Sequence, residues 1–154
     1  MDELQFSPKD SPSAVEKTPN GSTRVPTEKR TLRLLIVDDN QDAAESLSML
    51  LELSGHEARV AHDGLAALSL AESFLPDAIL LDIGLPRLNG YDAAKRIRES
   101  AWGAGMHLIA VTGYGQDSDR SRAKAAGFDH HLTKPLDIPT LIKLLEKGRS
   151  ASPR

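Results

Sequence analysis

Three aspartates, a threonine and a lysine each follow a short apolar run of the sequence: Asp38 and Asp39, Asp82, Thr112 and Lys134. If they converge, the three carboxylates and the lysine together carry a formal charge of −2. Such a cluster repels itself, and carboxylate oxygens are the ligands that a hard divalent cation such as Mg²⁺ prefers. With the cation bound, the pocket is neutral and can accept a phosphoryl group on an aspartate nucleophile. These residues therefore predict Mg²⁺-dependent phosphoryl chemistry, provided that the fold brings them together.

The pattern of the chain predicts such a fold, because apolar runs alternate with stretches of helical period. The runs lie at 34–37, 58–61, 78–81 and 108–111, with a weak fifth around 131–132, and the helices at 42–54, 64–74, 90–99, 118–126 and after the capping residue Asp137. Three runs are continuously apolar, as in parallel strands covered on both faces. We therefore expect a flavodoxin-like (βα)₅ fold, a doubly wound parallel sheet with strand order 2-1-3-4-5. In such a sheet the five polar residues share the carboxyl edge, which is the ligand side.

The helical period also predicts which side chains are buried. In the second helix it directs Leu65, Leu68 and Ala71 toward the core. The other helices are expected to bury Leu47, Leu50 and Leu51, then Tyr91, Ala94 and Ile97, and finally Leu141, Leu144 and Leu145. Four histidines are expected on the surface or in loops, without a metal role: His56, His62, His107 and His130.

Composition excludes several classes of protein. The chain has 154 residues, with 19 Lys and Arg against 22 Asp and Glu, and it contains no cysteine. Without a basic block it does not fit a nonspecific nucleic-acid binder, and we expect no direct DNA binding. The absence of cysteine excludes disulfides, cysteine-ligated metals and thiol nucleophiles. No apolar run approaches the roughly 18 to 20 residues that span a bilayer, so we expect a soluble, cytoplasmic protein without a membrane partner.

Composition also changes along the chain. Residues 1–30 hold four of the nine prolines and few apolar residues, so this segment cannot bury enough surface to offset its ordering entropy. We expect residues 1–30 to form a disordered tail, residues 31–148 to form one domain, and residues 149–154 to fray.

Four motifs in register resemble the response-regulator receiver domain of two-component phosphorelay signalling. They are LLIVDDN at 34–40, ILLDIGLPRLNGYD at 79–92, IAVTGY at 109–114 and HLTKPLD at 131–137. They span the whole expected domain in the family's order and spacing. Single fragments of this kind are weak indicators, whereas four in register are specific.

The resemblance implies a role for each site residue. Asp82 is the phosphoacceptor, and the Mg²⁺ ligands are Asp82, Asp39, Asp38 (mainly through water) and the backbone carbonyl of Gly84. Thr112 supplies the switch hydroxyl and Lys134 the cation that pairs with the phosphoryl group, while a cis peptide precedes Pro135. Where the family usually has Tyr or Phe as its second switch residue, this chain has His131.

The resemblance also implies partners. The phosphoryl donor is a histidine kinase or a phosphotransfer protein, and an unknown downstream protein binds the face formed by the fourth helix, the fifth strand and the fifth helix. Such a protein phosphorylates and dephosphorylates itself and is not a multiple-turnover enzyme.

Two alternatives stay open on sequence alone. The pocket could belong to a Mg²⁺-dependent aspartyl phosphatase that hydrolyses small phosphoesters, although no cap insertion interrupts the strands. The chain could also be the receiver at the end of a hybrid sensor kinase.

Overall fold

The computed structural model describes residues 31–113 and 117–148. The tail expected at 1–30 and the frayed end expected at 149–154 lie outside these residues. Helices and strands alternate along the described chain: β2 (Arg33–Val37), α1 (Gln41–Leu53), β3 (Glu57–Ala61), α2 (Gly64–Phe74), β4 (Ala78–Asp82), α3 (Gly90–Glu99), β5 (His107–Thr112), α4 (Asp117–Ala126), β6 (His130–Thr133) and α5 (Ile138–Lys147). Each predicted helix and strand is therefore present, with ends that differ by a residue or two.

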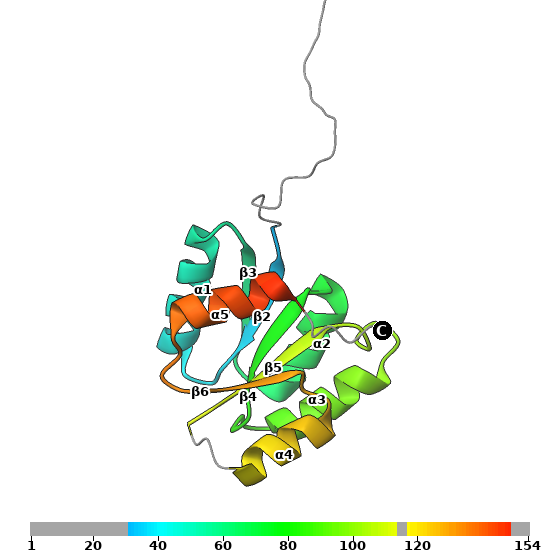
Figure 1. Ribbon diagram of the computed structural model, residues 1–154. Coiled ribbons are helices and arrows are strands. Elements are labelled where there is room, and N and C mark those ends of the chain that lie inside the picture. The colour runs from blue at the N-terminus through cyan, green and yellow to red at the C-terminus, as the bar shows by residue number, and fades with distance from the viewer. Residues whose placement is uncertain (1–30, 114–116, 149–154) are drawn as a thin grey trace, which may run out of the picture. The chain divides into compact units, whose positions relative to one another are not determined.

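The five strands of the described chain form one parallel sheet in the order β3-β2-β4-β5-β6. In chain order this is the predicted arrangement 2-1-3-4-5. Helices cover both faces of the sheet, with α1 and α5 on one face and α2, α3 and α4 on the other (Figure 1). The predicted doubly wound fold is confirmed.

The continuous apolar runs are explained by these two helical layers. Successive side chains of a strand point to opposite faces of the sheet. Accordingly, Leu35 and Val37 of β2 belong to the core beneath α2, α3 and α4, whereas Leu34 and Ile36 belong to the core beneath α1 and α5. The same division holds along β4 and β5. A central strand with both faces covered must be apolar at every position.

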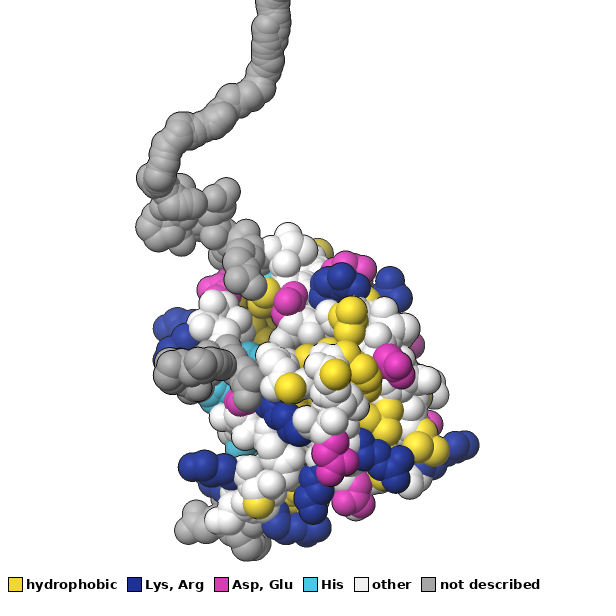
Figure 2. Space-filling view, turned by 90° about the vertical axis from the view of Figure 1, so that its right-hand side faces the viewer, with side chains coloured by type: hydrophobic (Ala, Val, Ile, Leu, Met, Phe, Trp, Pro, Cys, Tyr) yellow, Lys and Arg dark blue, Asp and Glu magenta, His cyan; other side chains and the backbone are white. Residues whose placement is uncertain are grey.

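The predicted inner face of α2 is partly wrong. Leu65 is 46% exposed, whereas Ala67, Ala71 and Phe74 are buried. The helix approaches the sheet through its small residues, and this rotates the longer Leu65 outward. Figure 2, which views the molecule from the side where α2 and α3 lie in Figure 1, shows hydrophobic side chains at the surface among charged ones. Leu50 of α1 is likewise 43% exposed, while Leu51 is buried as predicted.

The histidines were expected on the surface or in loops, and this is wrong for His107, which is 3% exposed and lies in β5. His56 does lie in a loop, the one between α1 and β3, but it is only 5% exposed. The ring of His56 accepts the backbone N–H of Leu32 at Nδ1, 3.1 Å away. His107 opens β5 and meets the ring of His130, the first residue of β6, edge-on at 4.9 Å between centroids. The apolar pattern of β5 begins only at Leu108, so it gave no indication that the strand includes His107.

None of the helices in the part of the chain that the structure describes is long and apolar enough to cross a membrane.

Candidate functional site

The carboxyl edge of the sheet brings three aspartates together. Asp82 is the last residue of β4, and Asp38 and Asp39 directly follow β2, which pairs with β4. One carboxylate oxygen from each of the three lies within 4.8 Å of the others. The convergence predicted from the sequence is therefore present.

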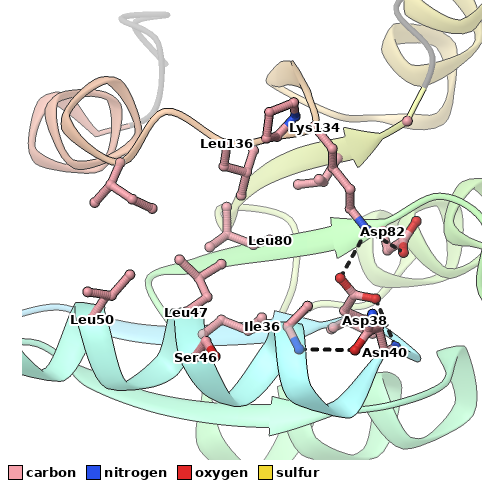
Figure 3. A pocket seen from close by; sticks show the side chains of 16 residues that line it. Ile36, Asp38, Asn40, Ser46, Leu47, Leu50, Leu80, Asp82, Lys134 and Leu136 are labelled. Atoms are coloured by element: carbon pink, nitrogen blue, oxygen red, sulfur yellow. Dashed lines mark hydrogen bonds and ion pairs between the residues drawn. The ribbon is translucent and has the colours of Figure 1, made fainter.

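Lys134 joins this cluster from the loop after β6. Its Nζ lies 3.1 Å from Asp38 Oδ2 and 3.3 Å from Asp82 Oδ2, so one ammonium group bridges two carboxylates (Figure 3). The backbone N–H of Lys134 donates to the carbonyl of Thr112 at 2.8 Å, which fixes the loop to β5. The peptide between Lys134 and Pro135 is cis, as the family resemblance predicts.

The loop after β2 leaves its two aspartates available for a ligand. An Asp-Asp pair before a helix often serves only as its N-cap, but here the capping residue is Asn40, whose Oδ1 accepts the N–H of Ala43 at 3.1 Å. Asp38 is largely buried and accepts the Asn40 N–H through Oδ1 at 3.0 Å, while Asp39 is exposed. Neither aspartate is used to cap α1.

The loop after Asp82 is held close to the Asp82 carboxylate. Asp82 Oδ1 accepts the N–H of Gly84 at 3.0 Å, and Gly90 donates its N–H to the carbonyl of Ile83 at 2.9 Å. A Cβ at Gly90 would lie 2.7 Å from the carbonyl oxygen of Asp82, a distance that Cβ atoms do not adopt. Glycine at this position therefore lets α3 begin directly against the strand end.

The electrostatics of the site follow from burial and mutual charge. Burial raises the pKa of the Asp82 carboxyl and the charge of Asp38 adds to the rise, while the Gly84 N–H and Lys134 oppose it. Burial lowers the pKa of Lys134, but hydrogen bonds and charges from Asp38 and Asp82 outweigh it, so the pKa is raised overall. Lys134 therefore stays charged at neutral pH and compensates part of the negative charge.

The donor set fits a hard divalent cation. Three carboxylates within reach of one another supply oxygen ligands only, which suits Mg²⁺ better than a soft transition metal. A single lysine leaves negative charge uncompensated, and a divalent cation would neutralise it.

The two predicted switch residues lie on adjacent strands. Thr112 ends β5 and is 8% exposed, and His131 is a half-buried residue of β6. The register pairs Ala110 with His131 and Thr112 with Thr133. Because every second residue of a strand shares a face, Thr112 and His131 point to the same side of the sheet.

Sequence reasoning missed an apolar groove beside the site. A cavity of about 630 Å³ runs between α1 and α5, with Asp38, Asp82 and Lys134 at one end. Its walls are mostly apolar and include Ile36, Leu47, Leu50, Leu80 and Leu136 (Figure 3). Leu50 lines this groove, whereas helical periodicity had assigned it to the core.

The model of the response regulator receiver domain family matches residues 34–146. The chain belongs to this family. Among curated relatives, the protein PilH of Pseudomonas aeruginosa is 36% identical over 113 residues, which cover 73% of this chain and 93% of PilH. The response regulator MprA of Mycobacterium avium is 34% identical over 111 residues, and there the match covers 72% of this chain but only 48% of the relative.

Solved receiver structures are similar as well. The chemotaxis protein CheY4 of Vibrio cholerae superposes with a TM-score of 0.73 at 27% identity, covering 77% of this chain and 99% of CheY4. The receiver domain of a sensor histidine kinase from Pseudomonas aeruginosa superposes with a TM-score of 0.72 at 30% identity, covering 79% of this chain and all of that domain, and it holds a magnesium ion in its active-site cleft. As a receiver domain, the chain is a phosphoacceptor switch of two-component signalling, and such domains are signalling switches and not classical enzymes.

Proposed function

We propose that Asp82 accepts a phosphoryl group from a phosphohistidine of a histidine kinase or phosphotransfer protein, with Mg²⁺ held in the same pocket. The observation that carries this proposal is the meeting of three carboxylates with Lys134 at the carboxyl edge of the sheet. The proposed Mg²⁺ ligands are Asp38, Asp39, Asp82 and the backbone carbonyl of Gly84. When bound, Mg²⁺ would neutralise charge on the phosphoryl oxygens.

Each side chain has a part in the transfer. A carboxylate oxygen of Asp82 attacks phosphorus while the bond from phosphorus to the donor imidazole nitrogen breaks, and that nitrogen keeps the electron pair. The product is an acyl phosphate on Asp82. Lys134 then exchanges its contact with the Asp82 carboxylate for one with a phosphoryl oxygen, and the Thr112 hydroxyl turns toward another. Catalysis on this proposal is positioning together with charge stabilisation.

The groove between α1 and α5 supports a protein donor. It ends at Asp82 and Lys134 and is walled largely by apolar side chains, so it offers a partner contact area that leads directly to the acceptor oxygen (Figure 3). On α1, Met49 and Leu53 are 63% and 83% exposed and extend the apolar surface of that helix. A phosphorylated histidine presented by a partner's apolar helix would fit this arrangement.

The proposed signal to a downstream protein passes through Thr112 and His131, which lie on the neighbouring strands β5 and β6. Movement of the Thr112 hydroxyl toward the phosphoryl group makes room along β5, which His131 on the same face of β6 can enter. The face formed by α4, β6 and α5 would then change shape for a downstream protein.

The test is phosphorylation by a small phosphodonor. Incubation with Mg²⁺ and acetyl phosphate should add one phosphoryl group by intact mass, and hydroxylamine should remove it. Asp82→Asn should abolish the addition, because it removes the nucleophile at nearly constant size. Asp92→Asn, an exposed aspartate in the first turn of α3, is the matched control and should label like the wild type. Labelling of Asp82→Asn at the wild-type level would contradict the proposal.

A further inference from the structure

A histidine outside the four motifs contacts the loop that carries two of the proposed ligands. His62 directly follows β3, and its Nδ1 lies 3.0 Å from the backbone carbonyl oxygen of Asp38. A carbonyl oxygen can only accept a hydrogen bond, so the ring must carry its proton on Nδ1. The bond therefore selects one tautomer of the imidazole.

The hydrogen bond from His62 matters because the Asp38 carbonyl lies directly before Asp39, a proposed Mg²⁺ ligand. This carbonyl belongs to the peptide group that joins Asp38 to Asp39, and the N–H of Asp38 donates on its other side to the carbonyl of Ala61 at 3.1 Å. The end of β3 thus holds the main chain of Asp38 at both of its polar groups. The Asp39 side chain is exposed, so its position depends on the orientation of its main chain.

The loop that carries His62 is itself packed against the other side of the site. A Cβ at Gly64 would lie 2.0 Å from the carbonyl oxygen of Leu88, so α2 begins in direct contact with the loop that follows Asp82. Asp63 caps α2 through Oδ1, which accepts the Ala66 N–H at 2.8 Å. Residues 62–64 are therefore held between the two loops that carry the carboxylates.

We propose that His62 is a positioning residue for the cation site: its Nδ1–H fixes the Asp38–Asp39 peptide and so holds the Asp39 carboxylate ready for Mg²⁺. This role rests on the proposed function above. Ordering a loop at the moment of binding costs affinity, and a hydrogen bond that orders it beforehand removes that cost. Loss of such outer partners typically weakens metal binding by 10- to 100-fold, and we expect about tenfold for a single carbonyl contact.

The side chains of Asn and Leu provide a matched pair at this position. They have nearly the same shape, and the Asn amide nitrogen occupies the place of the imidazole Nδ1. His62→Asn therefore keeps the donor, whereas His62→Leu removes it. His130→Phe, at the opposite edge of the sheet, controls for loss of a histidine as such. Mg²⁺ affinity of the full chain is measured by titration calorimetry, and urea unfolding without metal reports on the fold.

We expect His62→Leu to bind Mg²⁺ about tenfold more weakly than the wild type, and His62→Asn and His130→Phe to remain close to it. A purely structural role would lower the urea midpoint of both His62 variants and leave the Mg²⁺ affinity of the folded protein unchanged. Equal affinities of His62→Leu and the wild type, or equal weakening in His62→Asn and His62→Leu, would overturn the proposal. A wild-type chain that binds no Mg²⁺ would overturn the proposed function itself.

A second measurement needs no variant. Nitrogen-15 NMR of the His62 ring in the metal-free wild type, at about pH 8 where imidazoles are ordinarily uncharged, distinguishes the two tautomers. We expect the Nδ1–H form, although a free imidazole side chain prefers Nε2–H. The Nε2–H form would exclude the hydrogen bond and with it the role of His62.

Discussion

At the residue scale, His130 makes the stability of the domain depend on pH. Burial lowers its pKa below the ordinary value of 6.5, Lys147 acts in the same direction, and Asp129 opposes both. Well above pH 6.5 the ring is neutral in both the folded and the unfolded chain, so it does not make the free energy of unfolding depend on pH. As the pH falls through 6.5, the unfolded chain takes up a proton that the folded chain resists, and the free energy of unfolding decreases.

Replacing His130 should weaken this dependence. We expect urea midpoints between about pH 7.5 and 5.5 to fall less for His130→Gln than for the wild type, because the variant has no proton to take up there. The comparison is made in metal-free buffer, so that the carboxylate cluster behaves alike in both proteins. The same fall in both proteins would show that another group causes the acid sensitivity.

Individual side chains also mark the limit of prediction from sequence. The convergence of Asp38, Asp82 and Lys134 could be predicted, because each stands where an apolar run ends and parallel strands end at one edge. The contact between His62 and Asp38 could not, since it joins two loops and has no periodicity. The burial of His56 could not be predicted either, because its hydrogen-bond partner is the main chain of Leu32, which is distant in the sequence.

At the scale of helices and strands, Arg98 ties the end of α3 to the loops that precede β5 and β6. Its guanidinium donates to three carbonyls of the α3–β5 loop, those of Gly103, Ala104 and Met106, and to the carbonyl of Gly127 after α4. It also pairs with Asp129 at 2.7 Å, where the two side chains are 16% and 11% exposed. Asp129 in turn accepts the N–H of Leu108 in β5 at 2.9 Å.

We therefore expect Arg98→Ala to destabilise the domain strongly. Removing one partner of a largely buried ion pair leaves the other charge uncompensated and costs about 3–5 kcal/mol, and four carbonyls lose a donor as well. The free energy of unfolding in urea measures the loss. Arg96→Ala, an exposed arginine on the same last turn, is the control and should cost less than about 0.5 kcal/mol. Similar losses in the two variants would show that the ion pair and hydrogen bonds of Arg98 do not stabilise the domain.

The helices and strands themselves were the most predictable level of this structure. Their order follows from the alternation of continuous apolar runs with helical period, and Asp137 caps α5 as expected, accepting the N–H of Thr140 at 3.2 Å. The rotation of α2 was not predictable from periodicity, since Leu65 and Ala67 are both apolar. The distance between helix and sheet decides which of them faces inward, and the sequence does not state that distance.

At the scale of the whole molecule, the proposed switch must carry a signal from Asp82 to the face formed by α4, β6 and α5. Beryllofluoride, a phosphoryl mimic, should therefore shift the ring signals of His131 in NMR spectra recorded with Mg²⁺. The imidazole should enter the space beside Thr112 uncharged, because a buried charge carries a desolvation cost. Ring signals that stay unchanged while the Asp82 region responds would place the output elsewhere.

The two outer strands of the sheet, β3 and β6, affect whether one molecule can pair its sheet with that of another. An open sheet has two edges whose backbone groups can pair with a strand of another molecule, and long, flat, apolar edges invite aggregation. Here β6 is only four residues long, and β3 carries the exposed, oppositely charged Glu57 and Arg59 at 3.5 Å. An approaching strand would have to desolvate these charges or pair over a very short length. Both edges of the described sheet are therefore poor templates for pairing with a strand of another molecule.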